Sequence, residues 1–347
     1  MSQTISQTIS QTMSLTLTSR SSIPVRGPVQ DRQRGFTLIE MLISITIGLG
    51  ILAGLVGVLA SNAGNSRSND RTSELMTNGR YALNSMKQEM REAGFRGYTW
   101  AEPGPPGPWV APANTVGCFG TEAGASVSAF LANLRQGVWG ANNNNPFEAN
   151  CIPAANYSNG DDVLVVRRLS DAPVAALATN TVYFQSTYER GQLFRATAGA
   201  PVPPDFGTSR PVASFALQTH VYYISPFTVS AAESPRVPAL VRISLLPDGT
   251  MARELVASGI EHLQVQYGRR STAPDTQYVD VLPGSSSDAA GVAWEDVNSV
   301  RIWLLARSSA PEPGYANTTT YNMGDQNYVI NDGFRRQVFS TVVQLRN

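Results

Sequence analysis

The pattern of hydrophobic and polar positions divides the chain into three parts. Residues 1–35 are polar and rich in Ser, Thr and Gln, so they cannot bury a core. A predominantly apolar run follows from Phe36 to Ala60, and Glu40 is its only charged residue. A bilayer core about 30 Å thick needs roughly 20 apolar residues in a helix, so this run is long enough to span one.

The helical pattern continues beyond the apolar run. No proline occurs between Phe36 and Glu102, and apolar residues recur at helical spacing from about Arg67 to Ala93. Gly94 and Gly97 are typical helix stops. The pattern predicts one long helix whose second half packs an apolar stripe on a globular body. The stripe consists of Leu75, Ala82, Met86 and Met90, widened by Met76 and Leu83.

Strand patterns dominate the rest of the chain, after a proline-rich linker at 102–112. They are rich in β-branched and aromatic residues, and Pro247-Asp248-Gly249 supplies a turn between two of them. Because no helical pattern separates these runs, we expect an α+β fold with an antiparallel β-sheet packed on the long helix. The predicted strands are Asp162–Val166, Val182–Phe184, Val221–Ile224, Leu240–Leu246, Met251–Val256, Leu263–Tyr267, Val300–Leu305 and Val338–Leu345.

The charges around the apolar run indicate its orientation and suggest a function for Glu40. An acidic group inside a membrane helix costs roughly 2.5–3.5 kcal/mol even on lenient insertion scales, so its presence needs a reason. The preceding segment holds four arginines, including Arg32 and Arg34, against Asp31. Positive residues hold their end of the helix in the cytoplasm, which sends the body outward. An ordinary signal anchor with a polar residue near the interface is the alternative interpretation.

The peptide from Arg34 to Glu40, Arg-Gly-Phe-Thr-Leu-Ile-Glu, resembles the class III signal of type IV prepilins and type II secretion pseudopilins. In that family a prepilin peptidase in the membrane cuts after the glycine and methylates the new N-terminal phenylalanine. The resemblance therefore implies that the chain is cut after Gly35, that mature protein begins at N-methylated Phe36, and that Glu40 is its fifth residue. Translation starts at either Met1 or Met13.

This resemblance gives the expected organisation of the chain. Residues 1–35 form a cytoplasmic leader, 36–60 the membrane-spanning half of the helix, 61–97 its soluble half, and 98–347 a periplasmic β-rich body. Removing the leader from totals of 26 basic and 26 acidic residues leaves 22 and 25, so the mature chain has a net charge of −3. A mildly acidic chain without a basic stripe argues against nucleic acid as a partner.

Two C-terminal stretches, Val300–Ser308 and Phe334–Asn347, resemble PilW-type minor pilins. Leu255–Tyr267 and Arg91–Phe95 fit the same pattern. The middle of the chain, about Trp100 to Gly160, shows no such resemblance. It also lacks a cysteine soon after the Ala-Gly-aromatic stop, a common feature of the family, so a disulfide cannot be placed by analogy.

The resemblance implies a structural protein that joins other minor pilins, primes type IV pilus assembly and helps display a tip adhesin. Its partners would be the prepilin peptidase, the inner membrane, other minor pilins and the major pilin. The protein would move from the inner membrane to the pilus on the cell surface, with Glu40 pairing to the N-terminus of an adjacent subunit. The alternatives are a large pseudopilin of type II secretion and a surface-binding module built on the segment from Trp100 to Gly160.

The two cysteines, Cys118 and Cys151, follow the membrane segment. In an oxidising periplasm a disulfide is the default, and closing a loop of roughly 34 residues would stabilise the fold by about 3.5–4 kcal/mol in the entropy model. Two unrelated buried thiols and a metal site are the competing interpretations.

Catalytic chemistry has little support in the sequence. The only histidines, His220 and His262, fall on predicted strands and suit solvent-facing or structural roles. Asp161-Asp162 and Asn331-Asp332-Gly333 are typical of turns, without the alternating ligands of a calcium loop. The sequence has no zinc-protease motif, phosphate loop or nucleophile elbow. We therefore expect no enzyme activity, no cofactor and no metal.

Overall fold

A computed structural model describes residues 35–99, 118, 133–149, 151–179, 181–196, 211–246, 250–269, 277–280, 294 and 296–345. The chain forms two compact units, Met1–Ser61 and Asn62–Asn347. The leader up to residue 34, the proline-rich linker at 102–112 and the turn at 247–249 lie outside the described residues. Trp100 and Trp109 also lie outside them.

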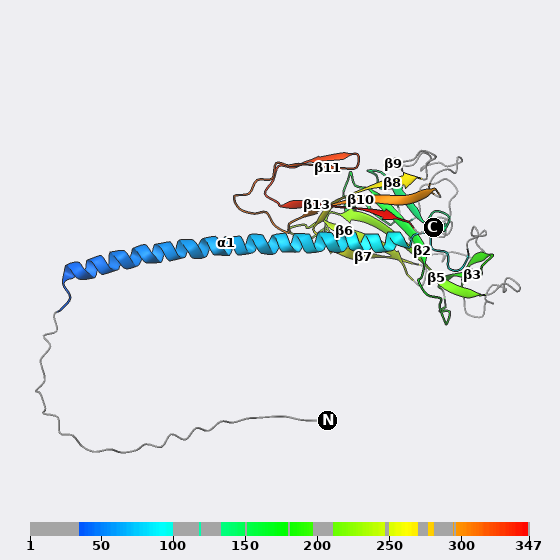
Figure 1. Ribbon diagram of the computed structural model, residues 1–347, viewed down its shortest axis with the longest axis horizontal. Helices are drawn as coiled ribbons and strands as arrows, with labels where there is room; N and C mark the ends of the chain where they lie inside the picture. Colours follow the sequence, from blue (N-terminus) through cyan, green and yellow to red (C-terminus); the bar gives the residue numbers. More distant parts are fainter. Residues whose placement is uncertain are drawn as a thin grey trace, which may run out of the picture. The chain divides into compact units, whose positions relative to one another are not determined.

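The first unit contains the N-terminal part of helix α1, Leu38–Arg91 (Figure 1). Its 54 residues include one stretch that is long and apolar enough to cross a membrane, and none of that stretch is buried within the chain. The predicted helix is therefore present, and its apolar half has no hydrophobic partner among the described residues.

In the second unit, the C-terminal part of α1 packs an apolar stripe on the body. The predicted stripe residues are all buried, and Gly79 joins them, whereas Met76 and Leu83 are partly buried against the same core. The helix ends at Arg91, and Gly94 and Gly97 follow with φ angles of 80° and 70°. Such left-handed backbone favours glycine, and Gly94 lies in the turn that directly follows the helix, as expected for a stop, whereas Gly97 lies in a separate turn six residues beyond Arg91.

A buried ion pair also joins the helix to the sheet. Arg168 Nε lies 2.9 Å from Glu89 Oε2, and Arg168 Nη1 lies 2.9 Å from Glu92 Oε2 and 2.6 Å from Asp171 Oδ1. The arginine side chain is only 9% exposed. Because removing one partner of a buried pair leaves a charge without compensation, this contact specifies how α1 docks on the body.

The larger sheet has seven strands, all paired antiparallel. Its main order is β1-β2-β5-β3-β4, while β6 pairs with β5 and β7 pairs with β6. The long strand β5 therefore joins the whole sheet, because it pairs with β2, β3 and β6 along its length. The strands are β1 (Val138–Ala141), β2 (Val163–Leu169), β3 (Val182–Ser186), β4 (Gly191–Arg195), β5 (Ala213–Ser225), β6 (Ala239–Leu245) and β7 (Met251–Ser258).

The second sheet has four antiparallel strands in the order β13-β10-β8-β9. Gly259, with a φ of 74°, stands between β7 of the first sheet and β8 of the second. A separate hairpin pairs β11 with β12. The strands are β8 (Ile260–Arg269), β9 (Gln277–Val279), β10 (Val297–Arg307), β11 (Thr320–Met323), β12 (Gln326–Val329) and β13 (Arg336–Gln344), and a short 3-10 helix covers Ala154–Asn156.

The structure confirms the predicted long helix packed on antiparallel β-sheet. The predicted strands belong to two sheets, however, and not to the single sheet that we expected. Each predicted run lies within or overlaps an observed strand, but β1, β4, β9, β11 and β12 were not predicted. The two larger sheets share one core with α1. Aromatic rings fill part of this core: Trp294 lies 6.0 Å from Trp139 and 4.8 Å from Tyr267 between ring centroids. Trp139 is thus a packing residue rather than a surface aromatic.

Candidate functional site

The expected cleavage site lies just ahead of α1. Gly35, Phe36 and Thr37 have no regular secondary structure, and the helix begins at Leu38. Phe36 is 80% exposed, and nothing lies within 4 Å of the position of a Cβ on Gly35. The peptide bond between Gly35 and Phe36 therefore lies in accessible, non-helical backbone, the form in which a peptidase can bind it.

Glu40 caps the helix that it belongs to. The backbone N–H and the hydroxyl of Thr37 each lie 3.4 Å from Glu40 Oε2, and the Glu40 N–H lies 3.4 Å from Thr37 Oγ1. This reciprocal arrangement is a capping box, with Thr37 as the N-cap and Glu40 three residues later. Our sequence reasoning missed it, although Thr-x-x-Glu is a readable signal.

The capping box determines where the acidic charge lies. It holds the Glu40 carboxylate beside the first free N–H groups of α1, where the helix dipole favours a negative charge. Both Thr37 and Glu40 are exposed in the isolated chain. The carboxylate is therefore positioned at the end of the helix and remains open to a group from outside the chain.

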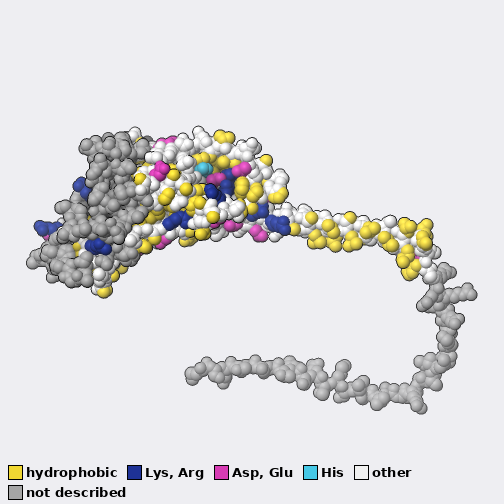
Figure 2. Space-filling view, turned by 180° about the vertical axis from the view of Figure 1, so that it is seen from behind, with side chains coloured by type: hydrophobic (Ala, Val, Ile, Leu, Met, Phe, Trp, Pro, Cys, Tyr) yellow, Lys and Arg dark blue, Asp and Glu magenta, His cyan; other side chains and the backbone are white. Residues whose placement is uncertain are grey.

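The N-terminal part of α1 exposes apolar side chains along its length, and Figure 2 shows many of them on the face in view. Large apolar residues from Leu38 to Leu59 are between 52% and 83% exposed. Gly48, Gly50, Gly54 and Gly57 have nothing within 4 Å of an added Cβ, so no described part of the chain approaches them. Lipid or other protein must cover this surface, because exposed apolar area on this scale is unfavourable in water.

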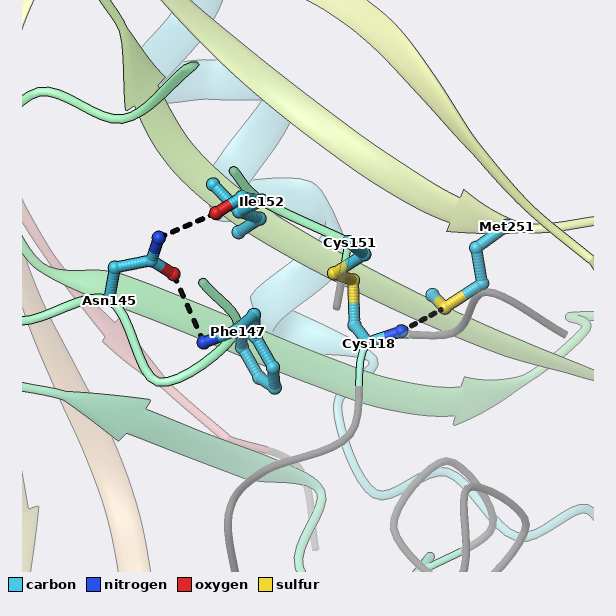
Figure 3. The surroundings of a disulfide bond; sticks show 6 residues. All are labelled: Cys118, Asn145, Phe147, Cys151, Ile152 and Met251. Carbon is cyan, nitrogen blue, oxygen red and sulfur yellow. Dashed lines mark hydrogen bonds between the residues drawn. A yellow bond between two sulfur atoms is a disulfide. The ribbon is translucent and has the colours of Figure 1, made fainter. Parts of the chain in front are cut away.

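The two cysteines form the second predicted site, and the structure joins them in a disulfide (Figure 3). Their Cα atoms are 5.0 Å apart, and Cys118 is fully buried. The N–H of Cys118 donates to Met251 Sδ at 3.3 Å, which attaches the bridge to the start of β7. The disulfide therefore joins Cys118 to the segment between β1 and β2, beside the start of β7.

Asn145 organises the chain next to the disulfide. Its Nδ2 donates to the Ile152 carbonyl at 2.7 Å, and its Oδ1 accepts the N–H of Phe147 at 3.1 Å (Figure 3). The side chain of Phe147 is fully buried. The asparagine-rich run thus includes a residue that closes a loop beside Cys151, which supports a structural role for this part of the segment.

The two histidines have structural partners. His220 Nδ1 lies 3.0 Å from Ser244 Oγ, and burial lowers the pKa of His220 to about 4. His262 Nδ1 lies 3.0 Å from Asp161 Oδ1, and its ring stacks on Tyr328 with centroids 3.8 Å apart. No metal-binding group of three or more acidic, histidine or cysteine side chains occurs among the described residues.

The adjacent acidic residues also have a structural role. Asp161 Oδ1 accepts the N–H of Leu263 at 3.1 Å, and Asp162 Oδ2 accepts the N–H of Val265 at 2.7 Å. These bonds join the start of β2 to β8, and therefore one sheet to the other. Burial raises the pKa of Asp162 to about 8, although the N–H groups that donate to its carboxyl partly oppose this shift.

Comparison with known families gives two matches, one near the N-terminus and one over the C-terminal third of the chain. The family model described as "Prokaryotic N-terminal methylation motif" matches residues 30–56. The model described as "Type IV Pilus-assembly protein W" matches residues 221–347, which begin within β5 and include all of the smaller sheet. The C-terminal stretches that resemble this family in sequence lie inside the second match.

No curated protein matches the chain. A solved structure, a type IV-like pilin from Thermus thermophilus, matches with 14% identity and a TM-score of 0.33, and the match covers 80% of this chain and 97% of that one. A likeness at that level carries no structural conclusion. The methylation motif on an exposed apolar helix, together with the match of residues 221–347 to the PilW model, supports a type IV pilin-like protein of the PilW type.

Proposed function

We propose that the protein is a minor pilin that helps to prime type IV pilus assembly and is incorporated near the filament tip with other minor pilins. The observation that carries the proposal is the unpartnered apolar half of α1, most of which lies within the methylation-motif match at residues 30–56. A helix with this surface can reside in the inner membrane and then pack against the same part of other subunits.

Processing comes first in the proposed sequence of events. A prepilin peptidase cuts the bond between Gly35 and Phe36 and methylates the new amino group. The exposure of this bond and the PilW domain beyond it support the assignment. Before cleavage the leader would hold its end of the helix in the cytoplasm, with the body in the periplasm, where the disulfide between Cys118 and Cys151 would form.

Glu40 would select the register of assembly. Its carboxylate is costly in hydrocarbon, and an ammonium group on the Phe36 nitrogen of an adjacent subunit could offset much of that cost. The capping box holds the carboxylate at the helix end, where such a group could reach it. Displacement along the filament would separate the two charges in a low dielectric, so docking at one axial position would be favoured.

The proposal describes an assembly protein, and its family and architecture are structural rather than enzymatic. Its partners would be the prepilin peptidase, other minor pilins and the major pilin, and it would help to display a tip adhesin. We expect the body, which contains the region matched by the PilW model, to carry the faces that such partners would contact.

A gene deletion tests the proposed role. The deletion strain should make fewer filaments, and any remaining filaments should keep their normal diameter in electron micrographs, because priming changes how often assembly starts rather than how subunits pack. Expression of the full chain should restore the number. Normal pili combined with loss of secreted enzymes would contradict the proposal and favour a pseudopilin of type II secretion.

A further inference from the structure

Strand β13 forms an open edge of the smaller sheet (Figure 1). Its strand partner is β10, in a register from Ser299 opposite Gln344 to Arg307 opposite Arg336. Among the described strands none pairs with its other side. The strand has no proline, and no charged residue occurs from Gln337 to Gln344. It therefore lacks the charges and prolines that commonly protect a sheet edge from further pairing.

The hydrogen bonds at both ends of β13 show which backbone groups face outward. The Leu345 N–H donates to the Asn298 carbonyl at 2.8 Å, and the Arg335 carbonyl accepts the Ser308 N–H at 2.9 Å. Because backbone groups alternate in direction along an antiparallel strand, the odd-numbered residues bond to β10. The even-numbered residues Ser340, Val342 and Gln344 direct their N–H and C=O groups toward the free edge, where no described residue bonds to them.

A groove separates this edge from helix α1. Its lining consists of Lys87 and Arg91 from the helix and residues 342–345 from the strand and its end. Nearer the start of the helix, Gly79 contacts the ring of Phe339. Since residues 342–345 lie beside Lys87 and Arg91, strand β13 runs beside α1 in the same direction as the helix. The groove thus has a backbone edge on one side and a helix on the other.

The helix supplies a cationic wall. Arg80 precedes Lys87 by seven residues and Arg91 by eleven, a spacing that places all three on one side of α1. None of the three has an ion pair with another described residue. Val342 of β13 is 49% exposed, and its side chain points to the sheet face opposite that of Phe339, because side chains alternate along a strand. The groove therefore combines strand hydrogen-bonding groups with positive charges that have no ion-pair partner among the described residues.

We propose that this groove binds an extended acidic segment of another polypeptide, which adds a strand beside β13. Its backbone would pair with Ser340, Val342 and Gln344, and its carboxylates would face Lys87 and Arg91. Charge complementarity selects this occupant over a neutral strand, since the cations have no partner within the described chain. The inference goes beyond the proposed function, because it assigns a docking surface that does not depend on which filament the protein joins.

Photo-crosslinking in living cells tests this docking directly. The probe is p-benzoylphenylalanine, placed at Val342 in the full chain, with Val329 of β12 as a control position that is 77% exposed. Mass spectrometry should map the Val342 crosslink to a different polypeptide, within about two residues of an aspartate or glutamate. The Val329 probe should not crosslink to the same segment.

Charge reversal then tests the cationic wall. The double variant Lys87→Glu/Arg91→Glu should lower the yield of the Val342 crosslink about tenfold, which corresponds to about 1.4 kcal/mol of binding free energy. The matched variant Arg190→Glu, on an exposed residue between β3 and β4, should leave it unchanged. Lysine in place of the mapped acidic residues should restore the crosslink to the double variant.

Several results would overturn the proposal. The first is a crosslink that maps to the same chain, to a second copy of it or to lipid alone. The second is a crosslink whose yield does not change on charge reversal, and the third is the absence of any crosslink from Val342. Circular dichroism of each purified full-length variant in detergent shows whether the fold is retained. If the double variant is unfolded, the single variants Lys87→Gln and Arg91→Gln take its place, and each should lower the yield.

Discussion

Gly79 of α1 and Phe339 of β13 are packed so closely that a Cβ on Gly79 would lie 2.2 Å from Phe339 Cε2. The glycine is buried, although it lies in the middle of a helix, where glycine is unfavourable by roughly 1 kcal/mol relative to alanine. Its missing side chain lets the aromatic ring lie against the helix backbone. This pair therefore determines how near the smaller sheet approaches α1.

Gly79→Ala should destabilise the body despite the higher helix propensity of alanine. Overpacking a core contact costs about 1–3 kcal/mol, which outweighs a gain of roughly 1 kcal/mol from helix propensity. Thermal unfolding of the full chain in detergent would show a lower midpoint. Phe339→Leu added to Gly79→Ala should recover part of the loss, because it removes the ring that the new methyl group meets.

Gly64→Ala is the matched control for this variant. Gly64 lies in the same helix with nothing within 4 Å of an added Cβ, so alanine there should leave the midpoint unchanged or raise it slightly. Equal effects at Gly64 and Gly79 would show that the close approach to Phe339 has no energetic consequence.

His220 should make the body less stable in acid. Its pKa is lowered to about 4 by burial, against an ordinary value of 6.5, so the unfolded chain binds a proton before the folded chain does. The stabilising effect is complete above about pH 6.5 and is lost as the pH falls through 4. His220→Gln removes this linkage, and we expect its unfolding midpoint to fall less between pH 7 and pH 5 than that of the unchanged protein. An identical fall in both would contradict the assignment.

The disulfide should be complete and stabilising in the exported protein. Peptide mapping without reduction should recover Cys118 and Cys151 joined, and alkylation of the folded protein should modify neither. Cys118→Ser/Cys151→Ser should lower stability by about 3–4 kcal/mol, because a loop of roughly 34 residues is no longer closed. Two thiols that react readily in the folded protein would refute the bond.

Glu40→Ala should separate assembly from folding. The variant should be inserted and cleaved normally, and the ion pair between Arg168 and Glu89 should be unaffected, because the change lies in the other unit. Entry into filaments should fall strongly, as measured by immunoblotting of sheared pili. Glu40→Gln keeps the shape but removes the charge, so it should share most of the defect.

Thr37→Ala distinguishes the two contributions of Glu40. It removes the hydroxyl of the capping box but leaves the carboxylate, and losing an N-cap costs about 1 kcal/mol of helix stability. Its assembly defect should be smaller than that of Glu40→Gln. Normal incorporation of both Glu40 variants would show that this carboxylate is not the docking charge.

The sequence was most informative for elements that bury one face against the core, because their hydrophobic residues then recur in a regular pattern. The stripe that begins at Leu75 is predictable because a helix hides the same face every 3.6 residues, and the buried strand near Val163 is predictable from its run of branched residues. The division into two sheets was not, because alternation indicates which face a strand buries and not which strand lies beside it. The sequence at Gly259, between β7 and β8, does not indicate whether the chain turns within one sheet or passes to a second sheet.

The polar contacts of the body were the least predictable part. Arg168 and Glu89 are 79 residues apart in sequence and meet only after the helix has docked. Strand β1 was missed because its four residues include Gly140, whose lack of a side chain admits the hydroxyl of Tyr267. The capping box was different, since Thr37 and Glu40 are neighbours in the sequence and follow a known pattern.

The mass of the protein recovered from sheared filaments tests the central claim most directly, because it reports processing and assembly together. We predict a chain that begins at Phe36 with one methyl group on its amino nitrogen, while Gly35→Val should accumulate the uncut form in the membrane. Filament-associated protein that retains residues 1–35, or a processed protein that never enters filaments, would contradict the account.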